Sequence, residues 1–114
     1  MDDIRVRGLR VEDVDDISRI QADITQASVN DDFKRIIHEQ AKNSENACFV
    51  AEFQGRVVGF MISYILSGSF GMEKSAWIAM LGVDPKYMGQ GIGKRLAGEI
   101  FEFYKSEGIE NIYT

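Results

Sequence analysis

Two apolar segments in the middle of the chain constrain the fold more than any other feature. Val57 to Leu66 and Ser75 to Val83 are nearly unbroken runs of apolar side chains. A strand that is apolar on both faces belongs in the interior of a sheet and not at its rim. Both runs are far shorter than the roughly 20 residues that cross a bilayer, so we expect no membrane span. The sequence therefore predicts a sheet with two buried strands.

The N-terminal part of the chain predicts a short strand and two helices. Ile4 to Arg7 alternates apolar and charged side chains, as a strand with one buried face does. A cluster of acidic residues after Val11 favours a helix start there, and these acidic side chains are expected to be solvated. A second helix is expected to begin at the capping residues Asn30 and Asp31. The apolar positions of the two helices are Val14, Ile17, Ile20 and Ile24, then Phe33, Ile36, Ile37 and Ala41.

Turn residues separate the central strands. Cys48 to Phe53 and the run from Val57 are joined by Gln54-Gly55-Arg56, which predicts a hairpin. Ser67 to Gly71 is polar and rich in glycine, so we expect a loop before the second apolar run. Asp84-Pro85 then ends that run.

The remaining elements complete a mixed fold. A helical pattern follows Gly91 and stops at Gly108, and Ile109 to Thr114 begins a last strand. The order is thus strand, helix, helix, strand, strand, strand, helix, strand. A mostly antiparallel sheet with one final strand–helix–strand crossover is an α+β, or mixed α/β, domain.

Chain length bounds the organisation. With 114 residues there is room for one domain, residues 1–114, and not for two. Thr114 follows directly on the start of the fifth strand, so we expect the fold to be truncated there, with its C-terminal part missing. A sheet left open in this way favours self-association, of which a homodimer is the simplest form.

Charge and cysteine content exclude several classes of function. The net charge is −5 and no segment gathers the lysines and arginines that bind a phosphate backbone, so nucleic acid is not an expected partner. The acidic N-terminus has no apolar run behind it, unlike a secretory signal or a transit peptide, which favours a cytoplasmic protein. Cys48 and His38 are the only residues of their types, so neither a disulfide nor a metal site is expected.

The chemistry of the chain is concentrated between its second apolar run and its last helix. This loop carries glycine at positions 89, 91 and 93. Glycine allows a backbone to come close to a ligand, and the first N–H groups of a helix are unpaired donors at the positive end of its dipole. The loop therefore predicts a phosphate or pyrophosphate site, which Gly91→Val should block while the core stays intact. The alternative is that the glycines only allow a strand to pack tightly on a helix.

Spacing separates three phosphate-binding motifs. The dinucleotide-binding fingerprint needs a third glycine where Leu96 stands. The nucleotide P-loop needs glycine at Met88 and serine or threonine at Arg95. Neither motif fits.

The third motif fits. Val83-Asp84-Pro85, Tyr87, and Gly89 to Gly93 before a helix strongly resemble the acetyl-CoA-binding motif Arg/Gln-x-x-Gly-x-Gly/Ala of the GNAT family of N-acetyltransferases. The order of elements is also similar to that fold as far as its fifth strand. The resemblance implies an enzyme that moves an acetyl group from acetyl-CoA to a primary amine by direct attack, without a covalent enzyme intermediate. A non-catalytic acyl-CoA-binding or regulatory module remains the alternative, because Met88 stands where the motif has Arg or Gln.

The resemblance also implies roles for individual residues. Gln90 to Lys94 would donate backbone N–H groups to the pyrophosphate of CoA, and Leu81 and Val83 would bond its pantetheine arm through their backbones. The cofactor-binding residues are thus Leu81, Gly82, Val83, Met88, Gly89, Gln90, Gly91, Ile92, Gly93 and Lys94. No catalytic acid or base is identified, and Glu73 and Tyr64 are the nearest ionisable candidates for a proton route. The amine could belong to a small molecule, a protein N-terminus or a lysine.

Overall fold

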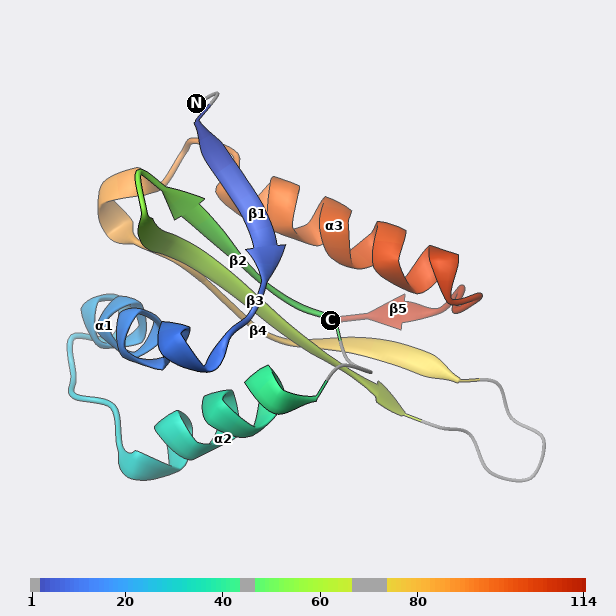
Figure 1. Cartoon of the computed structure of the whole chain (residues 1–114), viewed down its shortest axis with the longest axis horizontal. Coiled ribbons are helices and arrows are strands. Elements are labelled where there is room, and N and C mark those ends of the chain that lie inside the picture. The colour runs from blue at the N-terminus through green and yellow to red at the C-terminus, as the bar shows by residue number, and fades with distance from the viewer. Residues whose placement is uncertain (1–2, 44–46, 67–73) are drawn as a thin grey trace.

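A five-stranded sheet forms the centre of the described chain (Figure 1). The computed structural model describes residues 3–43, 47–66 and 74–114. The strands lie side by side in chain order, and all neighbours are antiparallel except the last pair, which is parallel. The strands are β1 (Ile4–Gly8), β2 (Cys48–Phe53), β3 (Arg56–Leu66), β4 (Ser75–Val83) and β5 (Ile112–Tyr113). The predicted mixed α/β fold and its order of elements are confirmed.

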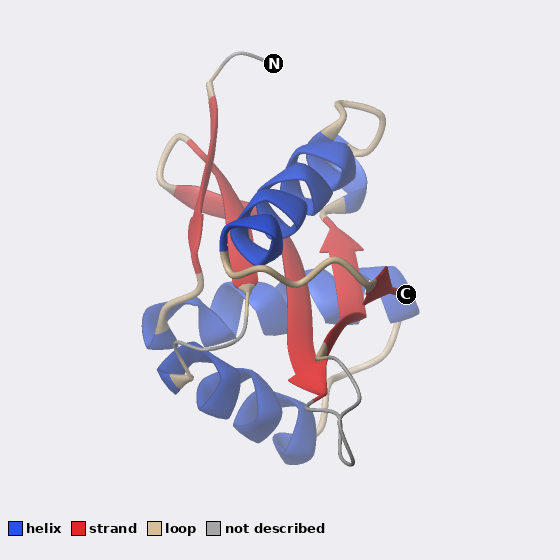
Figure 2. Cartoon of the chain, turned by 90° about the vertical axis from the view of Figure 1, so that its right-hand side faces the viewer, coloured by secondary structure: helices blue, strands red, loops and turns tan. Residues whose placement is uncertain are grey.

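Helices cover both faces of the sheet. Helices α1 (Val14–Thr25) and α2 (Asp31–Lys42) lie on one face and α3 (Ile92–Ser106) on the other (Figures 1 and 2). The short 3-10 turns η1 (Val11–Asp13) and η2 (Pro85–Tyr87) precede α1 and α3. Within the described ranges, no helix is long and apolar enough to cross a membrane.

Two buried clusters result, one on each face of the sheet. The strands alternate their side chains between the two faces, so neighbouring residues of β3 serve different clusters. The cluster on the α3 side includes Val58, Met61, Leu96, Ile100 and Tyr104, and the cluster on the α1 and α2 side includes Ile17, Ile20, Ile37, Phe60 and Ile62. Val57 to Ser63 is buried throughout, as expected for the central strand.

Local signals explain several boundaries. Gln54 and Gly55 have φ of 52° and 80°, the left-handed pair that closes a two-residue hairpin, so the predicted turn is confirmed. The Asn30 side chain accepts a hydrogen bond from the backbone N–H of Phe33 at 2.9 Å and caps α2. Helix α3 ends at Ser106, and Gly108, with a left-handed φ of 77°, turns the chain away from the helix axis two residues later. The loop predicted at Ser67 to Gly71 lies outside the described residues.

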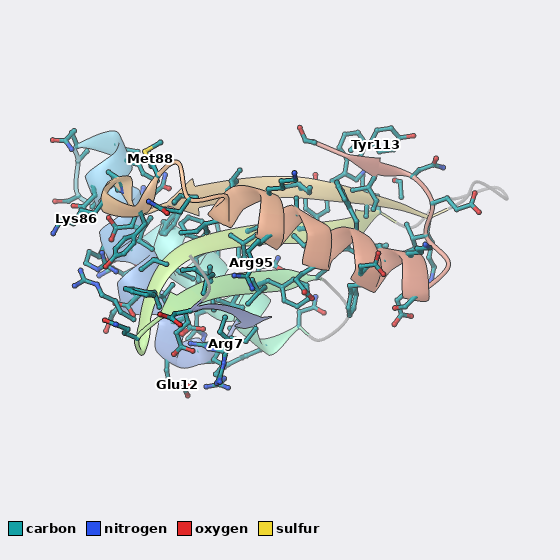
Figure 3. All side chains as sticks on the ribbon, turned by 90° about the horizontal axis from the view of Figure 1, so that it is seen from above. Arg7, Glu12, Lys86, Met88, Arg95 and Tyr113 are labelled. Atoms are coloured by element: carbon teal, nitrogen blue, oxygen red, sulfur yellow. The ribbon has the colours of Figure 1, made fainter. Side chains whose placement is uncertain are left out.

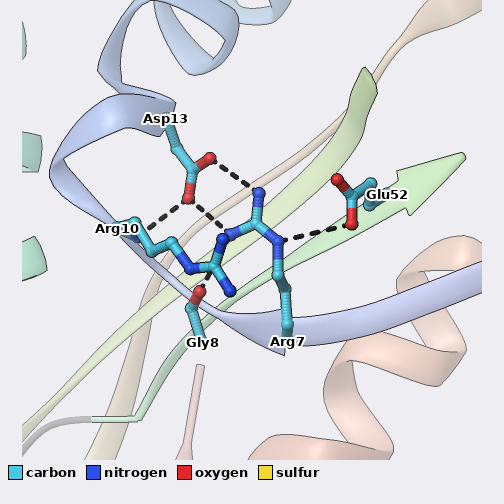
Figure 4. A network of polar contacts seen from close by, with 5 residues as sticks. All are labelled: Arg7, Gly8, Arg10, Asp13 and Glu52. Atoms are coloured by element: carbon cyan, nitrogen blue, oxygen red, sulfur yellow. Dashed lines mark hydrogen bonds and ion pairs between the residues drawn. The ribbon is translucent and has the colours of Figure 1, made fainter. Parts of the chain in front are cut away.

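One acidic residue departs from the expectation of solvated helix faces. Asp13 is only 4% exposed, and its carboxylate binds the guanidinium of Arg7 through both oxygens at 2.9 Å (Figure 4). It also accepts the backbone N–H of Arg10 at 2.8 Å, while Arg7 reaches Glu52 at 3.5 Å. The hydrogen bond to Asp13 raises the pKa of Arg7 above its ordinary value despite the desolvation that opposes the charge. The expectation is therefore wrong for Asp13, which fastens η1 to β1.

Candidate functional site

Strands β4 and β5 are paired over a very short distance. Their parallel ladder contains only Ala76 and Trp77 of β4, and in the described part of the chain no strand lies beyond Ile78 to Val83. The register with β3 also shifts here, which leaves Ala79 as an extra residue in β4. Such a bulge bends a strand and increases its twist. Most of β4 thus has an open outer edge.

The open edge presents backbone hydrogen-bonding groups. The N–H of Asp84 donates to the carbonyl of Val58 at 2.8 Å, which marks a hydrogen-bonded pair of the ladder with β3. In an antiparallel ladder such pairs alternate with pairs whose backbone groups point outward. Val83 and Leu81 fall on the outward positions, so their N–H and C=O groups face the open edge.

A hollow of about 500 Å³ lies beside this edge. It is bounded by β4, by α3 and by Thr114, and its lining is mostly apolar. Leu81 and Phe101, which line it, are 52% and 46% exposed. A ligand seated in the hollow would cover both side chains.

The glycine loop leads from this edge to the start of α3. Gly91 is the N-cap residue of α3, and no side chain caps the helix there. The first helical bond runs from the N–H of Arg95 to the carbonyl of Gly91 at 3.1 Å, so the N–H groups of Ile92, Gly93 and Lys94 precede it. The side chains of Lys94 and Arg95 are exposed. The end of α3 therefore combines unpaired donors, the positive end of the helix dipole and two cations.

Glycine occupies the positions of this region for different structural reasons. A Cβ atom at Gly82 would lie 2.4 Å from the ring of Phe60, so this glycine serves packing. Gly89 and Gly91 have φ of 83° and 78°, and a Cβ atom at either would meet nothing within 4 Å. Packing of a strand on a helix does not account for these two. A Cβ atom at Gly93 would lie 3.9 Å from the methyl groups of Leu81, at the hollow.

The comparison with known families agrees with this geometry. The profile of the acetyltransferase (GNAT) family matches residues 14–114. The chain belongs to the GNAT family. Membership makes acyl transfer the expected class of reaction. Among curated protein sequences, none matches this chain significantly.

Solved structures of several other proteins share the fold. An aminoglycoside acetyltransferase from an uncultured soil metagenomic sample superposes with a TM-score of 0.80 at 23% identity, covering 99% of this chain and 78% of its own. A ribosomal-protein-alanine N-acetyltransferase from Brucella melitensis biovar Abortus 2308 gives 0.76 at 17% identity, covering 97% and 79%. A transcriptional regulator from Bacillus halodurans C-125 gives 0.82 at 20%, covering 96% and 79%. At these identities the likeness concerns the fold alone.

Met88 is the departure of this chain from the GNAT motif. It directly follows η2 and is 66% exposed, near Lys86 at one end of the molecule (Figure 3). Its thioether is at best a weak acceptor and supplies no N–H donor. The backbone donors of the GNAT loop are present, and this one side-chain donor is not.

Of the two proton-route candidates, only Tyr64 belongs to the described residues, and it does not lie at the glycine loop. Glu73 lies outside the described residues. Tyr64 is half-buried on β3 opposite Trp77, five residues beyond the Gly59 position that faces the end of β4. At about 3.4 Å per residue, it lies roughly 17 Å along the strand from the loop. Tyr64 instead lies opposite Trp77, the last residue of β4 that pairs with β5. The described residues contain no group of three histidine, cysteine or acidic side chains that could hold a metal ion.

One buried charge at the site was not identified from the sequence. Asp84 is 1% exposed, and its carboxylate accepts the guanidinium of Arg19 at 2.9 Å and the N–H of Lys86 at 3.0 Å. Burial alone would raise the pKa of Asp84, but these two donors outweigh it and hold the pKa below its ordinary value. The sequence analysis used Asp84 as a strand end and as part of the Val83-Asp84-Pro85 motif, but it assigned no role to the carboxylate. No local pattern points to Arg19, which is 65 residues away along the chain.

Proposed function

We propose that this GNAT protein transfers an acetyl group from acetyl-CoA to a primary amine. The observation that carries the proposal is the continuity of the site: the uncapped start of α3, the glycine loop and the open edge of β4 with its hollow follow one another without a break. The pyrophosphate would accept hydrogen bonds from the backbone N–H groups of Gln90 to Lys94. The pantetheine arm would extend along Leu81 and Val83 as an added strand.

The proposed reaction is direct attack of a neutral amine on the thioester carbonyl. A C–N bond forms, the C–S bond breaks, the CoA thiolate takes up a proton, and the amine loses one. A backbone N–H at the parting point of β4 and β5 would polarise the carbonyl. Tyr64, close to that point, stays a candidate for the proton route, and Glu73 stays a prediction outside the described residues.

The decisive experiment is a titration with acetyl-CoA and with free CoA by calorimetry, using matched leucine variants. Gly93→Leu places a side chain at the hollow, whereas Gly98→Leu places the same side chain on the same helix, where a Cβ atom meets nothing within 4 Å. Neither glycine has positive φ, and leucine favours a helix over glycine, so both variants are expected to fold. We expect Gly93→Leu to weaken binding by at least about tenfold, and Gly98→Leu to leave it unchanged.

Two results would count against this assignment. If the folded wild type binds neither ligand, acetyl-CoA is not its substrate. If Gly93→Leu and Gly98→Leu lose the same amount of CoA affinity, the hollow is not the binding site.

The second candidate is a non-catalytic acyl-CoA-binding or regulatory module. It is favoured by Met88, which offers no donor at the motif position. Both candidates predict CoA binding, so turnover separates them. We expect release of free CoA thiol when acetyl-CoA and a panel of amines are supplied. Binding without release for any amine would favour the module.

The acceptor is proposed only as a class. The names of two solved relatives refer to an aminoglycoside and to a ribosomal-protein alanine, both of which carry amines. A small amine, a protein N-terminus and a lysine should all be in the panel. The cytoplasmic location and the single domain over residues 1–114 stay predictions.

A further inference from the structure

Asp84 is the point at which the candidate cofactor loop is fastened to the sheet. Its carboxylate accepts the N–H of Lys86 at 3.0 Å, and its carbonyl accepts the N–H of Tyr87 at 2.8 Å. Its own N–H donates to Val58 at 2.8 Å. These bonds join the end of β4 to η2, from which the glycine loop continues to α3.

The second carboxylate oxygen of Asp84 is held by Arg19 of α1. One guanidinium nitrogen donates to Asp84 and another to the carbonyl of Val57, both at 2.9 Å. Arg19 also lies 3.7 Å from Asp16, in a partly exposed pair. Because the guanidinium is a planar fork with fixed donor directions, binding two partners at once fixes Asp84 relative to the start of β3.

The opposite side of η2 is held by an aromatic contact. The ring of Tyr87 lies 5.7 Å from the ring of Phe53, and Tyr87 packs against the cluster on the α3 side. Beyond η2, Gly89 and Gly91 have backbones that adopt many conformations at low cost. The direction in which the loop reaches α3 therefore depends on how η2 is anchored.

We propose that Arg19 is a positioning residue for the cofactor loop, acting through Asp84 to hold η2 against the end of β4. This inference rests on the proposed function, because the ligand that the loop receives is the pyrophosphate of CoA. Arg19 itself does not line the hollow or the start of α3. Without its partner the Asp84 carboxylate is a buried, partly unpaired charge, which is relieved by movement of the residues bonded to it. Small displacements of groups that hold a ligand have large effects on binding and rate.

The test compares Arg19→Met with Arg35→Met. Both variants remove one arginine from an N-terminal helix, but the ion pairs of Arg35 with other described residues are exposed pairs on α2, with Asp32 at 3.3 Å and Glu39 at 3.9 Å. We expect Arg19→Met to weaken CoA binding about tenfold, at a temperature where circular dichroism shows the folded protein. Arg35→Met should change it by less than about twofold. Arg19→Lys should fall between wild type and Arg19→Met, since a lysine binds as a single point.

Amide exchange separates positioning from general stability. In Arg19→Met, the Lys86 amide, bonded to the Asp84 side chain, should exchange at least about tenfold faster. The Ala76 amide, which donates to Asn111 at 2.9 Å at the other end of β4, should keep its wild-type rate. Equal acceleration at both amides, or a lowered melting temperature with unchanged CoA affinity, would overturn the proposal.

A double variant tests the route through Asp84. If Arg19 acts through this carboxylate, Arg19→Met combined with Asp84→Asn should bind CoA no more weakly than Asp84→Asn alone. Additive losses would show that Arg19 acts elsewhere. If wild type binds no CoA, the proposed function fails, and the exchange of Lys86 alone then decides whether Arg19 positions the loop.

Discussion

At the scale of single residues, Met88 gives the sharpest prediction. Met88→Arg should tighten CoA binding, because an exposed guanidinium beside the loop could make a charge-assisted bond to a phosphate. A gain of about fivefold is expected, equivalent to ~1 kcal/mol by calorimetry. Ser106→Arg, which adds the same charge near the other end of α3, is the control for general electrostatic attraction. The same affinity in wild type and Met88→Arg would show that Met88 is no functional departure.

The glycines show how far the site could be predicted at this scale. In the sequence, Gly82, Gly89, Gly91 and Gly93 look alike, and the motif at Gly89 to Gly93 correctly predicted that a helix begins there. Why glycine stands at each position depends on backbone angles and on contact with Phe60 of β3, and the local sequence contains neither. With φ of 78° at Gly91, Gly91→Val would strain the backbone as well as obstruct a ligand. The comparison of Gly93→Leu with Gly98→Leu avoids that ambiguity.

At the scale of elements, the ion pair between Asp84 and Arg19 predicts a dependence of stability on pH. The pKa of Asp84 is lowered by folding, so its contribution is complete above the unfolded value and is lost as pH falls through the folded value. The free energy of unfolding should therefore decrease below about pH 4. Urea unfolding at pH 7 and pH 3 measures this.

The matched variant for that experiment is Asp84→Asn. It should destabilise the protein by about 2 kcal/mol at pH 7, because the pair is buried on one side and partly exposed on the other. It should also lose less stability than wild type between pH 7 and pH 3. An equal loss in both proteins would mean that other carboxylates account for the acid sensitivity.

The pattern of apolar residues predicted the helices and strands well where the burial of one face of the element determines its bounds. The bounds of β2 and β4 are those expected from the sequence, and both strands end at a clear change of polarity, before Gln54 and Asp84. The last strand is shorter than expected. Ile109 is buried and donates its N–H to Tyr104 at 2.9 Å, so it closes α3 before β5 begins. The first helix likewise begins with the turn η1, because Asp13 binds Arg7 of β1. Both differences arise from contacts between elements, which local patterns do not contain.

At the scale of the whole molecule, the edges of the sheet predict self-association. Tyr113 of β5 is 45% exposed on an outer strand of the described sheet, and its ring stacks on Trp77 at 4.6 Å. We expect sedimentation at increasing concentration to show a homodimer. A charge on an edge strand opposes pairing, so Tyr113→Lys should shift the equilibrium toward monomer by at least about tenfold, and Ser106→Lys should not. A wild type that stays monomeric throughout would contradict this prediction.

The outward peptide groups of Leu81 and Val83 have a consequence for how such a protein can change over time. If the carrier of the acyl group is recognised by main chain, the hydrogen bonds at these two positions do not depend on which side chain stands there, although the Leu81 side chain still lines the hollow. Substitutions that keep an apolar side chain could accumulate there without loss of the donor substrate. New acceptors could then be acquired by altering surfaces elsewhere, while the donor end of the reaction stays unchanged.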